Sequence, residues 1–252
     1  MPDFFTSHDG TKLAYEKLEA VEGNTQPGII FLCGYRSDMN GSKAMYLREL
    51  AHTQGRAFIR FDYFAHGDSE GDFLNGTISH WKKDVLHMID HLADPDRQHV
   101  IIGSSMGGWL ALLATLERPE RIHGLIGIAA APDFTDKLMY AKMNEEQKKT
   151  LEEQGYIEEP TEYSDEPYII TKKLIEDGAE HLLLDKECEI TAQVHLLQGK
   201  NDPDVPHEWA EKIKKALIKT DTHITYIDDG DHRLSRPQDL IVLQELIAHV
   251  SE

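Results

Sequence analysis

A serine with glycine two residues before it and two residues after it is the first feature of the sequence that could do chemistry. Gly103-Ser104-Ser105-Met106-Gly107 follows a short apolar run and precedes a stretch with helical periodicity, which is the strand–turn–helix context of a nucleophile elbow. A serine at the tip of so tight a turn takes a strained positive φ, and side chains two residues away on either side would collide with it. Only Ser105 has glycine at both positions, so it is the predicted nucleophile. A glycine-rich turn with an ordinary capping serine is the alternative.

A serine hydroxyl is a weak nucleophile at neutral pH, so it needs a general base, and the base needs an orienting acid. His232 is the candidate base, because it alone of the 14 histidines combines a late loop position with flanking turn residues. The loop after residues 194–199 offers two acids, Asp202 and Asp204, that both fit by position. Asp202 is preferred because it occupies the usual slot in the Gly-x-x-Asp-x-x-Val-Pro arrangement. The alternatives are a surface histidine without a role and an Asx-type turn ahead of a proline.

Two backbone N–H groups are needed to stabilise the negative charge of a tetrahedral intermediate. Met106 is expected to supply one of them, because it follows the nucleophile at the start of a helix. The loop after residues 28–34 is expected to supply the second, through the backbone N–H of Tyr35. Cys33 in this loop is predicted to be a small buried hydrophobic residue rather than a reactive thiol.

Other polar clusters have structural interpretations. His66 and Asp68 are predicted to support neighbouring loops from an ordered turn that follows a strand. His80, His87 and His91 lie at spacings of 7 and 4 on one predicted helix face, which is the spacing of a metal-binding stripe. No cysteine or carboxylate cluster accompanies them, so a solvated face is favoured. No metal and no organic cofactor is expected.

Short apolar runs alternate with amphipathic segments along most of the chain. Near-continuous apolarity predicts strands buried on both faces, and the alternation predicts a mostly parallel sheet flanked by helices. The predicted strands are residues 28–34, 57–62, 99–103, 124–130, 194–199 and 223–227. The predicted helices are residues 42–54, 81–93, 106–117, 208–220 and 238–250. The loops that carry the serine, the acid and the histidine should therefore meet above the carboxyl edge of one sheet.

One interval interrupts this alternation. Residues 133–189 show no strong strand pattern and carry dense charge, but they hold too many apolar residues for a disordered linker. We interpret residues 133–189 as a small helical cap insertion over the sheet. Residues 1–132 and 190–252 are then the α/β core.

Composition excludes several classes of function. The chain has 252 residues, with 26 Lys and Arg against 45 Asp and Glu, which gives a formal net charge of −19. Such an anionic surface disfavours nucleic acid and stable membrane association. The 2 cysteines cannot form a disulfide framework, the N-terminus has no signal or transit pattern, and no apolar run is long enough to span a bilayer. A cytoplasmic protein is expected.

Taken together, these segments resemble the alpha/beta-hydrolase family over essentially the full length. A closer likeness is to a branch with palmitoyl-protein thioesterases and acyl-glucuronide esterases, and to its bacterial relatives. The resemblance implies an alpha/beta-hydrolase fold and hydrolysis of small-molecule acyl esters or thioesters, with Ser105 as nucleophile, His232 as base and Asp202 as acid. The residues that carry it are 34–35, 39–44, 59–63, 81–86, 103–110, 118–120, Asp202 with 205–206, and 231–233.

Other functions stay open on the same scaffold. A serine nucleophile argues against the dehalogenases and epoxide hydrolases that use aspartate. It leaves a carbon–carbon bond hydrolase or a cofactor-free perhydrolase as alternatives. A second class is a non-catalytic protein that binds a small apolar acid; such proteins often lose triad members, whereas all three are present here.

Overall fold

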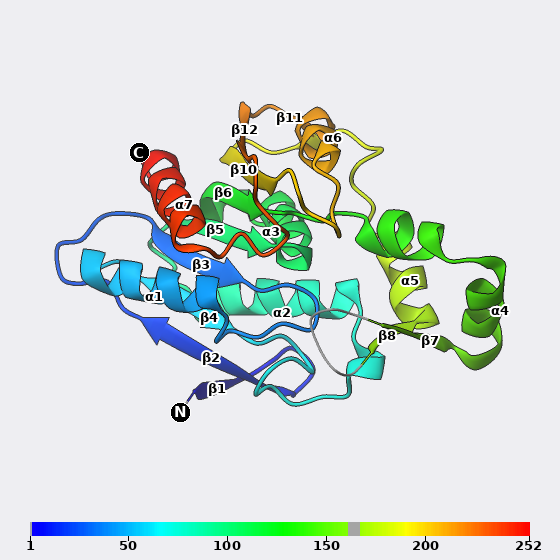
Figure 1. The fold of residues 1–252 in the computed structure, drawn as a ribbon. Helices are drawn as coiled ribbons and strands as arrows, with labels where there is room; N and C mark the ends of the chain where they lie inside the picture. Colours follow the sequence, from blue (N-terminus) through cyan, green and yellow to red (C-terminus); the bar gives the residue numbers. More distant parts are fainter. Residues whose placement is uncertain (1, 161–166) are drawn as a thin grey trace.

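The computed structural model describes residues 2–160 and 167–252, and its main feature is a large twisted sheet (Figure 1). Eight strands lie in the order β1-β2-β4-β3-β5-β6-β10-β12. Within this sheet, as far as the structure describes it, β1 with β2 and β2 with β4 pair antiparallel, and the other neighbours pair parallel. The strands are β1 (Asp3–Thr6), β2 (Lys12–Leu18), β3 (Gly28–Leu32), β4 (Phe58–Phe61), β5 (His99–Ser104), β6 (Ile122–Ile128), β10 (Gln193–Gly199) and β12 (Thr222–Ile227).

The parallel strands are those that the apolar runs predict. Every residue of β3, β4 and β5 is buried, because helices cover both faces of a parallel sheet. Strands β1 and β2 lie outside the predicted set. Their sequences mix charged and apolar residues, as is usual at a sheet edge that faces water on one side, and so they form no apolar run.

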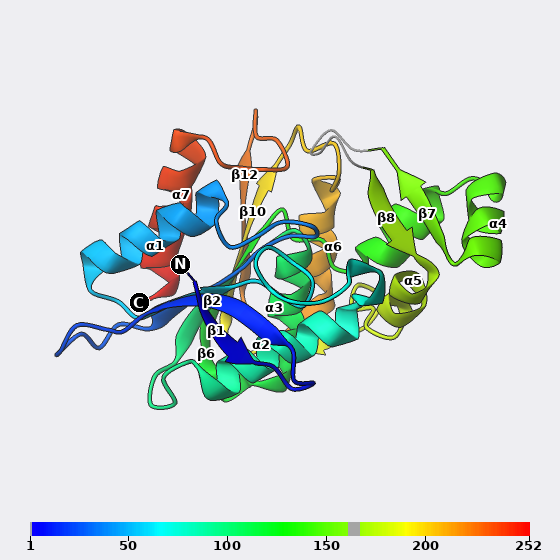
Figure 2. The same ribbon diagram turned by 90° about the horizontal axis from the view of Figure 1, so that it is seen from below.

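Helices pack on the two faces of the sheet (Figure 2). Helix α1 (Ser42–Gln54) packs with α7 (Pro237–Val250) on one face, and α2 (Ile78–His91) packs with α3 (Met106–Glu117) on the other. Helix α6 (Glu208–Ala216) packs against β12.

Two helix boundaries differ from the prediction by three residues or more. Helix α2 begins three residues before the predicted start, because the Thr77 side chain caps it by accepting from the backbone N–H of His80. Helix α6 ends at Ala216, since Leu217–Ile218 leaves the helix as the short strand β11 and pairs with β9 (Cys188–Glu189).

The interval 133–189, which the sequence predicts as a small helical insertion, contains short strands as well as helices. It contains short helical turns (Thr135–Met139, Tyr140–Lys142), α4 (Glu145–Gln154) and α5 (Lys172–Ala179), but also the antiparallel pair β7 (Tyr156–Glu159) and β8 (Tyr168–Thr171). These strands have four residues each and are partly exposed, so neither forms a long apolar run. Ile157 and Ile170 are paired in register and join a separate small apolar core with Leu151. The interval lies to one side of the sheet (Figures 1 and 2).

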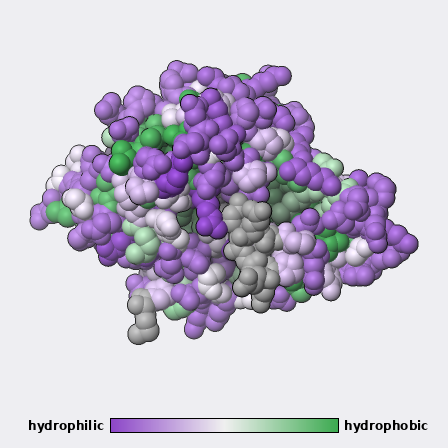
Figure 3. All heavy atoms as spheres, viewed as in Figure 1, coloured by the Kyte–Doolittle hydropathy of each residue, from purple (hydrophilic) through white to green (hydrophobic). Residues whose placement is uncertain are grey.

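The face shown in Figure 3 is mainly hydrophilic, consistent with the formal net charge of −19. Within residues 2–160 and 167–252, no helix combines the length and the apolar character that a membrane crossing requires.

Candidate active site

Ser105 lies at a strained turn between β5 and α3. Its backbone has φ 54° and ψ −118°, a conformation that a non-glycine residue adopts only when the surroundings hold it there. The two flanking glycines leave room for this turn. A Cβ on Gly103 would lie 2.2 Å from the carbonyl oxygen of Gly107, and a Cβ on Gly107 would lie 2.3 Å from that of Leu32. The predicted positive φ is therefore confirmed, and both positions require glycine. The nearest atoms that a Cβ would meet belong to the backbone of Gly107 and Leu32, whereas the sequence analysis expected a collision with the serine.

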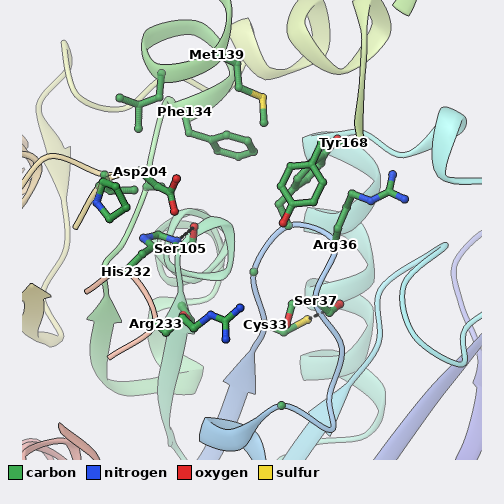
Figure 4. Close-up of a pocket in the computed structure, with 18 of the residues that line it drawn as sticks. Cys33, Arg36, Ser37, Ser105, Phe134, Met139, Tyr168, Asp204, His232 and Arg233 are labelled. Atoms are coloured by element: carbon green, nitrogen blue, oxygen red, sulfur yellow. Dashed lines mark hydrogen bonds between the residues drawn. The ribbon is translucent and has the colours of Figure 1, made fainter. Parts of the chain in front are cut away.

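The structure brings Ser105, His232 and Asp202 together at the carboxyl edge of the sheet. His232 Nε2 lies 3.2 Å from Ser105 Oγ, and His232 Nδ1 lies 2.8 Å from Asp202 Oδ2. The three residues follow β5, β10 and β12, and parallel strands place their carboxyl ends at one edge. The Asp202 side chain is fully buried, whereas His232 faces Ser105 at the floor of a cavity (Figure 4).

Of the two acids that the sequence leaves open, Asp202 contacts the histidine ring. Its Oδ1 accepts the backbone N–H groups of Asp204 and Val205, both at 2.9 Å. Its Oδ2 also receives the Gln198 side-chain amide at 3.2 Å. These bonds fix the carboxylate plane, so that Oδ2 is left facing His232. The Asp204 carboxylate lies within 4.8 Å of the same ring and lines the cavity above Ser105 (Figure 4).

The turn after β3 lies against Ser105. A Cβ on Gly34 would be 3.4 Å from Ser105 Cβ, so Tyr35 begins next to the nucleophile. Met106 is the first residue of α3, and the first N–H groups of a helix have no partner within the helix. Tyr35 and Met106 are therefore both close to Ser105 along the chain or across the turn, and their role as oxyanion donors stays a prediction.

Cys33 is buried at the base of this turn, with 2% of its surface exposed. Burial raises the pKa of its thiol well above the ordinary value, and Sγ donates to the carbonyl of Ser37 at 3.6 Å. A thiol held in the protonated form is a poor nucleophile, in agreement with the predicted role as a small buried residue.

A carboxylate that the sequence analysis did not single out holds the same turn. Asp62 accepts the N–H of Met39 at 2.7 Å and that of Asp68 at 3.0 Å. The loop support expected of Asp68 therefore involves its backbone N–H and the Asp62 carboxylate. The glycine at position 67 fits this contact, because a Cβ there would lie 2.1 Å from Asp62 Oδ2.

His66 supports the turn as expected. Its Nε2 accepts the backbone N–H of Arg36 at 3.3 Å, and its Nδ1 lies 3.0 Å from the carbonyl oxygen of Phe64. Burial lowers the pKa of His66 to about 4, so the ring is neutral at physiological pH.

Lys43 joins the start of α1 to the loop that carries His232. Its Nζ donates to the carbonyl of Arg233 and, at 3.2 Å, to Ser235 Oγ. Burial lowers the pKa of Lys43 to about 8. The backbone beside His232 is thereby tied to a helix that begins more than 180 residues earlier in the chain.

A cavity of about 930 Å³ opens above Ser105, between the core loops and the interval 133–189. The interval contributes apolar side chains to it, and Phe134, Met139 and Tyr168 line it opposite Ser105 (Figure 4). The core contributes mostly polar residues, among them Ser37 and Arg233. The volume is that of a site for a small organic molecule. The apolar part of this lining, Phe134, Met139 and Tyr168, could not be identified from the sequence, because it meets the core loops only in the folded chain.

Two groups of histidine and carboxylate side chains are close enough to hold a metal ion within the described part of the chain. One is Asp202, Asp204 and His232, at the site already described. The other is His8, His80 and Asp84, where both Asp84 oxygens already accept hydrogen bonds, from Ser7 Oγ at 2.7 Å and from Phe64 N–H at 3.0 Å.

The predicted alignment of His80, His87 and His91 does not converge on one point. The His80 ring stacks on Phe64, whereas His87 stacks on Phe5 and donates to the carbonyl of Thr6 at 3.1 Å. The interpretation as packed and solvated side chains is therefore favoured.

Comparison with known proteins extends the likeness to whole chains. The family profile described as serine aminopeptidase, S33 (Hydrolase_4) matches residues 25–239. The human protein named palmitoyl-protein thioesterase ABHD10, mitochondrial, is 36% identical over 95% of this chain and 76% of its own length.

Two solved structures share the fold over the full chain. A hydrolase from Agrobacterium vitis S4 is 39% identical, with a TM-score of 0.94 over 100% of this chain and 99% of its own. Mouse alpha/beta hydrolase domain-containing protein 10 is 34% identical, with a TM-score of 0.88 over 100% of both chains. The full-length match, the mostly parallel sheet and the serine at the elbow all indicate the same family. The chain therefore belongs to the alpha/beta-hydrolase family of serine hydrolases and esterases and is related to the ABHD10 thioesterases.

Proposed function

We propose that the protein hydrolyses carboxylic esters or thioesters through a covalent acyl-serine intermediate. One observation carries the proposal. Ser105, at a strained elbow, lies 3.2 Å from one ring nitrogen of His232, and the buried Asp202 carboxylate lies 2.8 Å from the other. This arrangement is the one in which a serine hydroxyl becomes nucleophilic at neutral pH.

Each residue has one role in the proposed reaction. Ser105 Oγ attacks the carbonyl carbon while His232 Nε2 takes its proton. Asp202 holds the His232 Nδ1–H and stabilises the imidazolium that forms. The backbone N–H groups of Tyr35 and Met106 donate to the oxyanion. His232 then protonates the leaving alcohol or thiol, and a water molecule activated by the same ring releases the acid.

The cavity supports an acyl group of apolar character. We assign the acyl chain to the side lined by Phe134, Met139 and Tyr168, and the leaving group to the polar side formed by the core loops. On this proposal residues 133–189 form a cap over a core of residues 1–132 and 190–252. The names of the curated relatives favour depalmitoylation of proteins as the specific activity, with hydrolysis of acyl glucuronides as the other candidate from the sequence resemblance.

The test compares the wild type with Ser105→Ala. We expect a fluorophosphonate probe to label the wild type alone, and p-nitrophenyl esters to be hydrolysed several orders of magnitude faster by the wild type. Matched S-acyl and O-acyl substrates of increasing chain length then separate thioesterase from esterase activity. Equal hydrolysis by both proteins would refute the assignment of Ser105.

The remaining candidates give different results in the same panel. A carbon–carbon bond hydrolase would be labelled but would prefer a diketone, and a perhydrolase would form peracid from acetate and peroxide. A non-catalytic binding protein would react with no probe. The cytoplasmic location remains a prediction; the curated relatives are mitochondrial by name.

A further inference from the structure

The turn that presents Tyr35 to the nucleophile has an unusual backbone. The N–H of Ser37 donates to the carbonyl of Gly34 at 3.1 Å, which closes a four-residue turn. Its third residue, Arg36, has φ 54°, a value that turns of this kind normally reserve for glycine or asparagine. A non-glycine residue in this region costs about 1 kcal/mol or more of conformational energy unless contacts hold it. An external contact is therefore needed to keep this turn in one form.

His66 makes that contact through a ring whose tautomer is determined by its partners. A carbonyl oxygen can only accept, so the Nδ1 that faces the Phe64 carbonyl at 3.0 Å carries the hydrogen. Nε2 of the neutral ring is then a lone pair, and it accepts the Arg36 N–H at 3.3 Å. The ring is buried, with 3% of its surface exposed. The Phe64 carbonyl also accepts from Trp81 Nε1 at 3.1 Å, which ties the loop to α2.

The rings of Tyr35 and His66 share two neighbours, Phe73 and Trp81, and Tyr35 has further contacts of its own. The Tyr35 hydroxyl donates to the carbonyl of Ile169 at 2.9 Å, and its ring packs edge-on against Phe73 and Tyr168. Losing the Nε2 acceptor would therefore leave the side chain of Tyr35 in place. It would free the Arg36 N–H and loosen the four-residue turn of residues 34–37, of which Tyr35 is the second residue.

We infer that His66 is a positioning residue for the oxyanion hole: its Nε2 lone pair holds the Arg36 N–H and thereby keeps the Tyr35 N–H directed at the substrate oxygen. The inference rests on the proposed function, since Tyr35 matters only if an oxyanion forms at Ser105. Loss of one oxyanion donor typically lowers kcat by about 10²–10³-fold, and a donor that is misdirected part of the time should have a smaller effect.

The central test compares His66→Leu, which fills similar space without an acceptor, with His66→Gln, whose amide oxygen can reach the position of Nε2. We expect His66→Leu to lower kcat by about 10- to 100-fold with little change in KM, and His66→Gln to restore most of the rate. A trifluoromethyl ketone, which forms a tetrahedral adduct with the serine, should bind His66→Leu more weakly by the same factor. Trp81→Phe is the matched control, because it removes the hydrogen bond to the Phe64 carbonyl, keeps an aromatic ring beside Tyr35 and His66, and leaves Nε2 intact. It should keep the wild-type affinity for the ketone.

Several results would overturn the inference. Unchanged kcat and unchanged ketone affinity in His66→Leu would overturn it. A loss of ketone affinity in Trp81→Phe as large as that in His66→Leu would also overturn it, because the loop would then act only through its stability. If His66→Leu does not fold, ¹⁵N NMR of the wild-type ring decides: a hydrogen on Nδ1 supports the inference, and a hydrogen on Nε2 overturns it. A wild type that neither hydrolyses esters nor binds the ketone would refute the proposed function and this inference with it. A variant His66→Leu that matches an active wild type would refute this inference alone.

Discussion

Asp202 is the most informative residue to change, because an amide can keep the two bonds from backbone N–H groups and lose the one to His232. The bond from the Gln198 amide to Oδ2 is lost as well, but that amide also donates to the carbonyl of Val205 at 3.2 Å. In Asp202→Asn the amide oxygen can stay at the Oδ1 position, where it accepts the N–H groups of Asp204 and Val205 at 2.9 Å. The NH₂ group then takes the place of Oδ2 and faces His232 Nδ1, which lies at 2.8 Å in the wild type. We therefore expect the fold to be retained.

The effect on the reaction should be large, because two donors cannot share that hydrogen bond. The NH₂ group donates to Nδ1, which moves the ring hydrogen to Nε2, the atom that must take the proton of Ser105. The carboxylate that would stabilise the imidazolium is lost as well. The same change in serine proteases lowers kcat by about 10⁴-fold, which corresponds to roughly 5.5 kcal/mol of transition-state stabilisation. We expect a loss of about 10³–10⁴-fold here.

The assay is the steady-state hydrolysis of a p-nitrophenyl ester, with thermal unfolding as the check on folding. Asp204→Asn is the matched control, since it removes one negative charge from the neighbouring acid and leaves Asp202 in place. We expect Asp204→Asn to retain most of the activity. A larger loss in Asp204→Asn than in Asp202→Asn would refute the assignment of the acid and the reasoning from the hydrogen bonds.

Three further predictions follow from single contacts. Gly107→Ala should lower the free energy of unfolding by about 3 kcal/mol or more and abolish activity, because its Cβ would lie 2.3 Å from the Leu32 carbonyl oxygen. Urea unfolding measures the loss. Gly41→Ala is the tolerated control, because the nearest atom to its Cβ would be 3.7 Å away. Burial raises the pKa of Asp84 from 3.8 to about 7. Between these two values the native state holds a proton that the unfolded chain releases. The free energy of unfolding that this group contributes is therefore lost as the pH rises from 4 to 7. Asp84→Asn, which cannot ionise, should gain on the wild type by up to about 4 kcal/mol over that range in unfolding experiments, and parallel pH profiles would contradict this. Phe134→Ala should enlarge the cavity and shift the preferred p-nitrophenyl ester towards longer acyl chains; an unchanged preference would place the acyl group elsewhere.

Much of the site could be predicted from local sequence, because its constraints act over a few residues. The turn at Ser105 requires glycine two positions away on both sides, and the five-residue segment 103–107 shows this pattern directly. The apolar runs likewise predict the parallel strands, because burial on both faces leaves no room for polar side chains. The order of these strands along the chain then places Ser105, the acid and His232 at the carboxyl edge.

Only the tertiary structure decided which side chains meet. Asp202 and Asp204 are two residues apart in the same loop, and the contact with His232 depends on the plane that two backbone N–H groups impose on one carboxylate. The bonds from Asp62 and His66 to the turn after β3 join segments more than 20 residues apart, and no local pattern specifies such a pairing. The strands β7 and β8 are short and half-exposed, so they are stabilised by their contacts with each other and with a small apolar core. The cavity has the same origin, because its walls come from two segments that are apart in sequence and adjacent only in the folded chain.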